Sequence, residues 1–400
     1  MRILITSSTF PVSLDEGGPR FVFDLAKALT SHGSVEVLAP HAPGAPRRES
    51  WSGVTVERFR YFWPNRLQRL AYGGGMRENM RASWLAILQV PFLLSAQTWR
   101  IRRRSGHIDV VNSHWMVPSG LTAAWARGRR RRFRHVLHVH AADVYLLATL
   151  PFGSRLARYV LRRTDAVLAD GSHVRTALDE LVGFSTGATL RPMGAWVDDF
   201  QAAVEATPNR HQAGYLVFVG RLVEKKGVTY LIEAMETIRR HHPQLGLVII
   251  GDGPLRASLE ADRRRLGLEE AIEFVGALPH DEVIRVILRS RLAVVPSVID
   301  AKGETEGMPT VVIEMMAAGL PVVGSDVDGI PDVIDHGRNG WLARPADPAD
   351  LSATILQALE SDDHGVRESA LTTAASHDWA EVALAYVPHL DPDLARGGGI

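Results

Sequence analysis

The sequence predicts an α/β protein built from two doubly wound, Rossmann-like domains that face each other across a cleft. Short runs rich in β-branched residues alternate with longer amphipathic segments, which is the pattern of βαβ units and parallel sheets. Two such series follow one another along the chain. A length of 400 residues is also more than one hydrophobic core ordinarily needs.

The order of the expected strands locates the two domains. The first series comprises Ile3–Ser7, Val35–Ala39, Asp109–Asn112, Val136–His140 and Ala166–Ala169. The second comprises Tyr215–Val219, Gly246–Ile250, Ile272–Val275, Leu292–Val295 and Pro321–Val323. A polar stretch at Trp196–Ala213 separates them. We predict domains at 1–200 and 201–375, and a C-terminal segment at 376–400 whose last seven residues read as disordered.

Composition excludes several classes of protein. The apolar share of 46% and charged share of 22% are those of a soluble globular protein. No cysteine is present, which excludes disulfides, thiolate metal sites and a cysteine nucleophile. The longest apolar stretch, Trp84–Leu94, is too short to span a bilayer, and Met1 leads directly into a strand-like run. We therefore expect a cytoplasmic protein. The segment His41–Gly53, rich in Pro, Gly and Arg, reads as an exposed loop.

The net charge of zero hides an asymmetry between the halves. Residues 1–200 carry 27 Lys and Arg against 15 Asp and Glu, a balance of +12, and residues 201–400 carry 18 against 30, a balance of −12. Either the two domains attract each other, or the basic half faces an anionic membrane or acceptor. The helical stretch from about Arg77 to Arg104 ends in WRIRRR. We favour a membrane-facing surface there, and the alternative places Trp84, Leu85, Leu88, Leu93 and Leu94 in the core.

The most informative segment is PSVIDAKGETEGMPTVVIEMMAAGLPVVG at residues 296–324. Glu306 lies in its loop and Glu314 inside the helix that follows, with Pro309 expected as the first helical residue. The backbone N–H groups from Gly307 to Val311 carry the positive end of the helix dipole and favour phosphate. Fixed carboxylates accept hydrogen bonds from sugar hydroxyls. Together these groups suit a nucleotide-sugar.

This segment resembles the glutamate–seven–glutamate signature of retaining glycosyltransferases of the GT-B fold, glycosyltransferase family 4. Four other segments resemble the family in the family's order: EGGPRFVFDLAKAL at 16–29, HVHAADV at 138–144, GRLVEKKG at 220–227 and GDGP at 251–254. The resemblance extends from about Met1 to Leu390. It implies that the N-terminal domain presents the acceptor, that the C-terminal domain binds a nucleoside-diphosphate sugar, and that a last helix crosses back to the first domain.

The resemblance assigns roles to residues in the C-terminal domain. Arg221 and Lys226 would neutralise the diphosphate as it leaves, in place of a divalent metal. Glu314 would hold the ribose, and Glu306 would contact the donor sugar near the reacting carbon. The complete predicted donor site is Gly17, Gly18, Arg221, Lys226, Gly251, Glu306, Gly307, Met308, Pro309, Thr310, Val311 and Glu314. No metal ligand is predicted, because Asp326 and Asp328 lack a third partner in the sequence.

In the N-terminal domain the predicted catalytic residue is His140, which would orient the donor hexose. His138 lies two residues earlier on the same strand face and is the competing candidate. Ala141 follows, where the family pattern usually has glycine. The predicted acceptor contacts are His114 and Asp143.

We therefore predict a retaining, metal-independent hexosyltransferase without a cofactor, with a UDP-sugar or GDP-sugar as donor. Its acceptor would be a glycan, a lipid-linked sugar or a small molecule, in cell-surface polysaccharide biosynthesis. Same-face attack assisted by the leaving phosphate is favoured over a covalent role of Glu306. No nucleic-acid partner is expected. The protein would be cytoplasmic, with peripheral contact at the inner face of the plasma membrane. The rival functions are a nucleotide-sugar epimerase of the same fold and a non-catalytic subunit that binds nucleotide-sugar.

Overall fold

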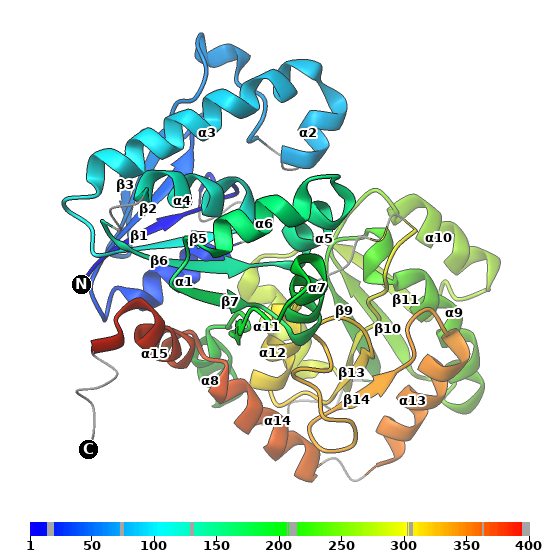
Figure 1. The fold of residues 1–400 in the computed structure, drawn as a ribbon. Coiled ribbons are helices and arrows are strands. Elements are labelled where there is room, and N and C mark those ends of the chain that lie inside the picture. The colour runs from blue at the N-terminus through cyan, green and yellow to red at the C-terminus, as the bar shows by residue number, and fades with distance from the viewer. Residues whose placement is uncertain are drawn as a thin grey trace. The chain divides into compact units, whose positions relative to one another are not determined.

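The computed structural model describes residues 1–13, 20–72, 76–128, 132–205, 207, 214–301, 303, 307–361 and 364–393. The chain forms two compact units, each an α/β assembly with its own sheet (Figure 1). Unit 1 combines Met1–Met193 with Trp379–Ile400, and unit 2 is Gly194–Asp378. The predicted fold class, two Rossmann-like domains, is confirmed.

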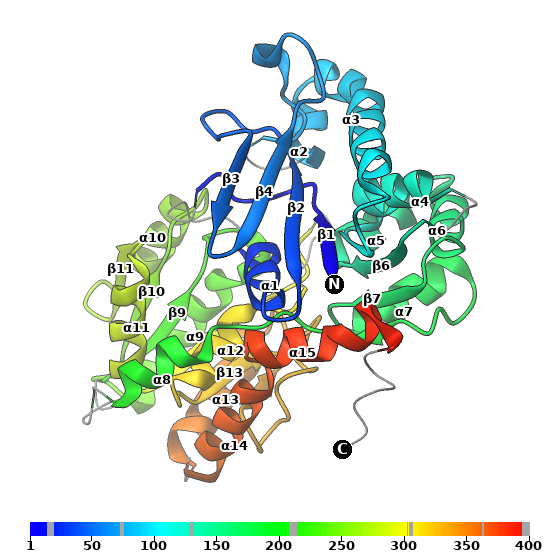
Figure 2. The ribbon, with the colours of Figure 1, turned by 90° about the vertical axis from the view of Figure 1, so that its left-hand side faces the viewer.

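Unit 1 is built around an eight-stranded sheet in the order β3-β4-β2-β1-β5-β6-β7-β8 (Figure 2). Neighbouring strands are parallel except β3 and β4. The strands are β1 Arg2–Thr6, β2 Ser34–Pro40, β3 Arg48–Trp51, β4 Val54–Phe59, β5 Val110–His114, β6 Arg134–Val139, β7 Ala166–Ala169 and β8 Thr189–Leu190.

The segment expected to be an exposed loop, His41–Gly53, contains strand β3, so that prediction was wrong in part. Strands β3 and β4 form an antiparallel hairpin in which Trp51 pairs with Val54. The two residues between them, Ser52 and Gly53, have φ of 49° and 85°. Two successive residues with positive φ match the right-handed twist of paired strands, which is why such turns close hairpins.

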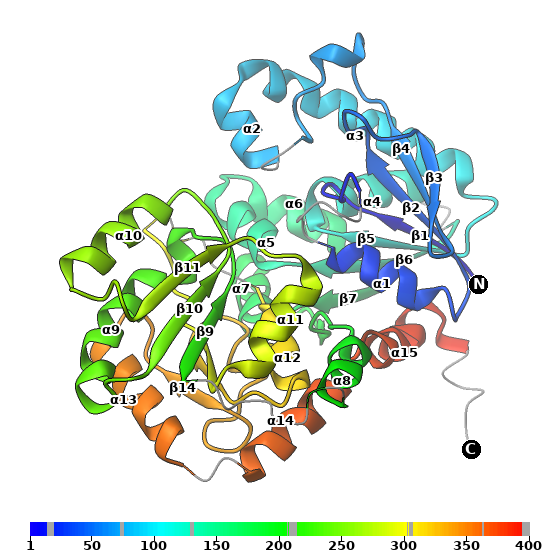
Figure 3. The ribbon, with the colours of Figure 1, turned by 180° about the vertical axis from the view of Figure 1, so that it is seen from behind.

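Helices cover the sheet of unit 1. They are α1 Phe21–Leu29, α2 Met76–Ala82, α3 Trp84–Arg104, α4 Leu121–Arg127, α5 Ala141–Thr149, α6 Gly153–Leu161, α7 Ser172–Val182 and α15 Trp379–Leu390, with short turns η1 Asn65–Leu67 and η2 Met116–Gly120. Leu93 of α3 and Ala123 of α4 pack in one cluster with Leu4 of β1. Helix α15 comes from the end of the chain and lies beside α1 (Figure 3).

Helix α15 is anchored to the sheet by hydrogen bonds to its backbone. Nε of Arg134 donates to the carbonyl of His389 at 2.6 Å, and Nε of Arg191 donates to the carbonyl of Ala385 at 3.2 Å. The rings of Trp379 and Tyr386 are buried. The C-terminal segment is thereby part of the core of unit 1.

Unit 2 is built around a six-stranded parallel sheet in the order β11-β10-β9-β12-β13-β14. Its strands are β9 Tyr215–Val219, β10 Gly246–Ile250, β11 Ile272–Gly276, β12 Leu292–Val295, β13 Val322–Ser325 and β14 Trp341–Ala343. Its helices are α8 Val197–Glu205, α9 Val228–His241, α10 Arg256–Arg265, α11 His280–Arg289, α12 Thr310–Ala317, α13 Pro348–Glu360 and α14 His364–Ser376, with the turn η3 Glu224–Lys226.

Alternate residues of β9 point into two separate cores, as the period of two along a strand requires. Leu216 and Phe218 join one cluster with residues of α9, α10 and α13. Val217 joins the other cluster with residues of α8, α11 and α12. The sheet is therefore covered on both faces (Figure 3), which explains its near-continuous apolar strands. Within the described residues, no helix is both long enough and apolar enough to cross a membrane.

Candidate active site

Both sheets have a topological switch point at which the strand order reverses. In unit 2, β9 lies between β10 and β12, and in unit 1, β1 lies between β2 and β5. Ligands of open parallel sheets bind beyond the carboxyl ends of the strands at such points. The loops that follow β9, β10 and β12 in unit 2, and β5 and β6 in unit 1, are therefore the places to examine.

In unit 2 the loop after β9 carries Arg221 and Lys226. The Arg221 side chain is exposed and Lys226 is half-buried. A Cβ atom at Gly220 would lie 3.1 Å from Cζ of Phe218 and 3.4 Å from Cε of Lys226, so the stem of Lys226 packs next to the backbone of Gly220. Both cationic groups are held by a turn at the carboxyl edge of the sheet, where a diphosphate could be neutralised.

The loops after β9 and β10 are joined through glycines. Gly251 has φ of +131°, and a Cβ atom there would lie 1.9 Å from the carbonyl oxygen of Gly220. A Cβ at Gly253 would lie 2.4 Å from the carbonyl oxygen of Leu222, whose N–H donates to the carbonyl of Asp252 at 2.9 Å. Because only glycine permits this approach, the GRL and GDG segments form one unit.

The loop after β12 packs against the same turn. A Cβ at Gly227 would lie 1.8 Å from the carbonyl oxygen of Pro296, and the N–H of Val298 donates to the carbonyl of Lys225 at 2.8 Å. Three loops from adjacent strands thus hold Arg221 and Lys226 in place. This assembly lies wholly within unit 2.

Helix α12 begins one residue later than predicted. Pro309 has φ of −73° and ψ of 111°, which is extended, and it precedes the helix instead of being its first residue. The N–H of Val312 donates to the carbonyl of Pro309 at 3.0 Å. The amides of Thr310 and Val311 lie in the first turn, where no intrahelical acceptor exists, so they carry the positive end of the dipole.

One face of α12 is accessible and contains the second signature glutamate. Thr310, Val311 and Glu314 are half-buried, while Val312, Ile313, Met315 and Met316 are buried in the core. Glu314 lies one turn after Thr310, and helical side chains lean toward the helix start. Glu314 is thus on the same face of the helix as Thr310, toward the helix start. The adjoining Gly307–Met308 segment is held by the loop after β13, where the N–H of Gly329 donates to the carbonyl of Gly307 at 3.3 Å. Met308 is buried.

Three predicted donor-site residues, Gly17, Gly18 and Glu306, lie outside the described residues.

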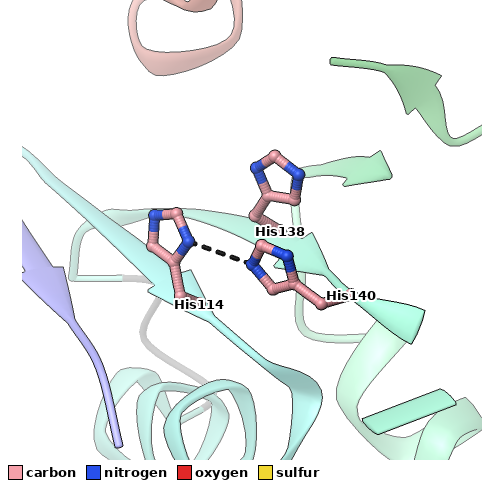
Figure 4. Close-up of side chains that lie close together, drawn as sticks. All are labelled: His114, His138 and His140. Carbon is pink, nitrogen blue, oxygen red and sulfur yellow. Dashed lines mark hydrogen bonds between the residues drawn. The ribbon is translucent and has the colours of Figure 1, made fainter. Parts of the chain in front are cut away.

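In unit 1, three buried histidines gather at the ends of β5 and β6 (Figure 4). Nδ1 of His114 lies 3.2 Å from Nε2 of His140, and Nδ1 of His140 lies 3.0 Å from Oδ2 of Asp170. A carboxylate can only accept, so His140 donates its Nδ1–H to Asp170. The contacts with Asp170 and His114 together fix the orientation of the His140 ring. His138, the competing candidate, instead bonds through Nδ1 to the hydroxyl of Tyr386 on α15.

Burial keeps His114 and His138 neutral. It lowers the pKa of His114 and of His138 well below the ordinary value of 6.5, and the nearby His140 lowers both further. Burial also raises the pKa of the Tyr386 phenol well above 10. Among the described residues, Nε2 of His114 and Nε2 of His138 have no hydrogen-bond partner.

The histidine rings are stacked in a way that does not suit a metal ion. Their ligand atoms lie within 4.8 Å of one another. However, the ring planes of His138 and His140 are 4° apart at a centroid distance of 4.7 Å, and His114 is inclined to them by about 20°. An imidazole binds a cation through an in-plane lone pair on nitrogen. One cation cannot lie in the planes of two parallel rings stacked face to face. As arranged, the three histidines form a packed cluster and not a chelate.

Asp143 was predicted to contact the acceptor, but the contacts observed for it are with the backbone of unit 1. It is buried, and its carboxylate accepts hydrogen bonds from the backbone N–H groups of His140 and Met116, which caps the start of α5. Burial raises the pKa of Asp143 to about 6, although His140 and the two amide bonds act in the opposite direction. Its observed contacts hold the backbone of His140 in place. The acceptor contacts of Asp143 and His114 remain predictions.

The sequence analysis did not identify the residues that contact His140 and His138, which are Asp170 and Tyr386. Asp170 immediately follows the strand β7, and a polar residue directly after a buried strand is a usable signal for the carboxyl edge of a sheet. Tyr386 lies about 250 residues from His138 along the chain, and no local pattern connects the two.

Two Rossmann-like units with polar and glycine-rich loops at their strand ends define the class of protein as GT-B. Two family models match the chain: "Glycosyl transferases group 1" over residues 199–374 and "Glycosyl transferase 4-like domain" over residues 16–194. The chain belongs to the group 1 glycosyltransferases, glycosyltransferase family 4.

Individual relatives agree with this membership. The amylovoran biosynthesis glycosyltransferase AmsK of Erwinia amylovora is 36% identical over 152 residues, which are 38% of this chain and 37% of AmsK. Glycogen synthase of Mycobacterium tuberculosis is 25% identical over 96% of this chain and 93% of its own. The crystal structure of Anabaena HepE in complex with UDP has a TM-score of 0.68 and 18% identity, and the match covers 98% of this chain and all of that one.

Proposed function

We propose that this glycosyltransferase moves a hexose from a nucleoside-diphosphate sugar to an acceptor with retention of anomeric configuration. The observation that carries the proposal is the turn at the switch point of unit 2, which holds Arg221 and Lys226 at the carboxyl end of β9, next to the strand β12 that leads to α12. Cationic side chains and unpaired backbone donors at one edge of a sheet form an environment suited to a diphosphate. UDP is the preferred donor nucleotide, because a protein of similar fold has been solved with UDP bound.

In this proposal each group has a defined task. Arg221, Lys226 and the amides of Thr310 and Val311 stabilise the charge that develops on the leaving diphosphate. Glu314 accepts hydrogen bonds from the ribose hydroxyls, and Glu306 contacts the donor sugar. For unit 1 we propose that His140, oriented by Asp170, meets the transferred hexose. The acceptor attacks from the same face, and the leaving phosphate takes up the acceptor's proton.

We also propose that transfer needs no divalent metal, because two cationic side chains and the helix dipole supply positive charge at the diphosphate. The acceptor is proposed to be a precursor of a cell-surface polysaccharide. Support for this comes from AmsK, whose name assigns it to amylovoran biosynthesis. A cytoplasmic location with peripheral contact at a membrane completes the proposal.

The test is binding of UDP to the Lys226→Ala variant. A thermal-shift titration of the wild-type protein should give an increase equivalent to about 2.7 kcal/mol when UDP is present at a hundred times its Kd. Loss of Lys226 removes a charge-assisted bond of about 1.5–3 kcal/mol, so we expect the affinity for UDP to fall roughly 10–100-fold. Transfer or donor hydrolysis should be lost, and the unfolding temperature without ligand should be unchanged.

The matched control is Lys225→Ala, which removes the neighbouring lysine of the same turn. Equal loss of UDP affinity in both variants would contradict the assigned role of Lys226. Addition of EDTA should leave UDP binding and turnover unaltered. Activity that EDTA abolishes and added Mg²⁺ or Mn²⁺ restores would overturn the metal-independent mechanism.

A further inference from the structure

The outward face of α3 is apolar. Trp84, Ile87, Leu88, Phe92 and Trp99 are between 52% and 72% exposed. Ile87 and Leu88 follow Trp84 by three and four residues, Phe92 follows Leu88 by four, and Trp99 follows Phe92 by seven, so all five lie along one side of the helix. We call these five residues the α3 face. The alternative considered from the sequence placed Trp84, Leu85, Leu88, Leu93 and Leu94 in the core. It was wrong for Trp84 and Leu88, which are exposed, and correct for Leu93, which is buried.

The buried side of α3 carries two of the helix's polar residues. Gln89 and Gln97 are completely buried. Oε1 of Gln89 accepts from the N–H of Arg69 at 3.0 Å, and the hydroxyl of Thr122 donates to Oε1 of Gln97 at 3.1 Å. A surface helix of a soluble protein normally turns its apolar side inward and its polar side outward. Helix α3 exposes large apolar side chains while it buries amides, so folding of unit 1 does not account for its outer side.

A neighbouring loop extends the apolar surface. The ring of Phe62 packs edge-on against Phe92 of α3, with the centroids 5.3 Å apart. The next residue, Trp63, is 79% exposed. Three exposed tryptophans thus lie on or next to one surface. Tryptophan is the side chain most enriched where an apolar phase meets water, because its ring is apolar and its N–H needs a polar partner.

The same surface is strongly basic. Arg102 and Arg103 are exposed at the C-terminal end of the α3 face, and the guanidinium of Arg103 lies 5.1 Å from the ring centre of Trp99. Residues 60–104 contain nine arginines and a single acidic residue, Glu78. Arg100 and Arg104 are ion-paired with Glu57 and Glu36, so the positive charge at this end of α3 comes from Arg102 and Arg103. Apolar side chains beside a band of positive charge match the two layers of an anionic bilayer surface, which are acyl chains and phosphate headgroups.

We propose that the α3 face docks on a membrane that contains anionic lipids, with α3 lying in the plane of the interface. Trp84, Ile87, Leu88 and Phe92 enter the headgroup–acyl boundary while Arg102 and Arg103 contact lipid phosphates. This inference deepens the membrane contact named under the proposed function, and it does not depend on which sugar is transferred. A second copy of the chain fits this face less well, because it would bring two positively charged surfaces together.

The test is co-sedimentation of the full chain with vesicles of 70% phosphatidylcholine and 30% phosphatidylglycerol at 0.1 M NaCl, against pure phosphatidylcholine. The wild-type protein should bind the anionic vesicles and be released at 0.5 M NaCl, since screening weakens the headgroup contacts. Leu88→Ser/Phe92→Ser should weaken binding at least tenfold. Arg102→Glu/Arg103→Glu should do the same, because each arginine near the surface accounts for about a fivefold change.

Matched controls separate this face from exposed or basic residues in general. Phe152→Ser/Phe184→Ser removes two aromatic rings that are 66% and 50% exposed elsewhere on unit 1. Arg264→Glu/Arg265→Glu reverses two charges in the last turn of α10, a helix that ends in three arginines as α3 does. Both controls should bind vesicles as the wild type does. All variants should still show the thermal shift with UDP, which tests the proposed function independently.

Three outcomes would overturn the inference. The first is failure of the wild type to sediment with anionic vesicles at 0.1 M NaCl. The second is a loss of binding in the control pairs as large as that in the α3 pairs. The third is a wild-type dimer in sedimentation velocity that Leu88→Ser/Phe92→Ser dissociates, which would make the α3 face a contact between copies.

Discussion

Desolvation governs the chemistry of the residues around His140. His114 and His138 are completely buried, and burial lowers the pKa of each, so both stay neutral at physiological pH. The ring of His140 is oriented by Asp170, while the carboxylate of Asp143 fixes its backbone. Both contacts restrict the position of His140, and both carboxylates are buried.

The raised pKa of Asp143 predicts a pH dependence of stability. Its pKa rises from 3.8 to about 6 on folding, so the native state binds the proton more tightly than the unfolded state. The associated stabilisation is fully present below pH 4 and is lost as the pH rises through about 6, by about 3 kcal/mol in total. Urea unfolding of the wild type and of Asp143→Asn at pH 4 and pH 7 measures the effect.

The stability of the wild type relative to Asp143→Asn should fall by about 2.5 kcal/mol from pH 4 to pH 7. Any fixed cost of the altered cap in Asp143→Asn contributes equally at both values and cancels. A difference that does not change with pH would show that the carboxyl group keeps an ordinary pKa in the folded protein.

At the scale of the structural elements, close contact between backbones sets the geometry of the loop after β9, which carries Arg221 and Lys226. Gly220, Gly227, Gly251 and Gly253 let the loops after β9, β10 and β12 touch through their backbones. The sequence showed these glycines as parts of separate motifs. Only the paired strands explain why they occur together, since the parallel register brings the ends of adjacent strands to one edge.

Gly251→Ala should therefore be strongly destabilising. The new Cβ would lie 1.9 Å from the carbonyl oxygen of Gly220, and φ of +131° is unfavourable for alanine. We expect a loss of about 3 kcal/mol or more, from backbone strain together with overpacking, and weaker UDP binding. Chemical denaturation and a UDP titration measure both effects.

Gly267→Ala is the control, because Gly267 also has positive φ, of +66°, but nothing lies within 4 Å of its Cβ position. It should cost only about 1 kcal/mol and leave UDP binding unchanged. If both substitutions lowered the stability by a similar amount, the loop after β9 would have to move aside for the new Cβ. That result would contradict a rigid contact between the loops after β9 and β10.

At the scale of the whole molecule, the end of the chain completes the first unit. Helix α15 buries Trp379 and Tyr386, and its backbone carbonyls accept from Arg134 and Arg191. Unit 1 is consequently built from both ends of the sequence, while unit 2 is continuous.

Truncation after Asp378 should therefore destabilise unit 1 and spare unit 2. Loss of buried Trp or Phe side chains costs about 3–5 kcal/mol each, and two such residues approach the whole stability of a domain. Calorimetry should show that the transition of unit 1 is lost or shifted strongly to lower temperature, while a second transition that responds to UDP persists. Truncation after Asp393, which retains α15, should leave both transitions unchanged. A single unaltered transition in the shorter chain would refute this division of the molecule.

The sequence alone determined the α/β class and the family, because the period of apolar residues and the spacing of motif residues are local properties. It placed His114, His140, Arg221 and Lys226 near strand ends for the same reason. Only the tertiary structure decided that Asp170 and Tyr386 join the histidines, that His41–Gly53 contains a strand, and that α3 turns its apolar side outward. The contacts of Asp170 and Tyr386 join residues 30 and 248 positions apart, which no local pattern connects. Strand β3 instead pairs with the adjacent strand β4, so there a local hairpin was overlooked.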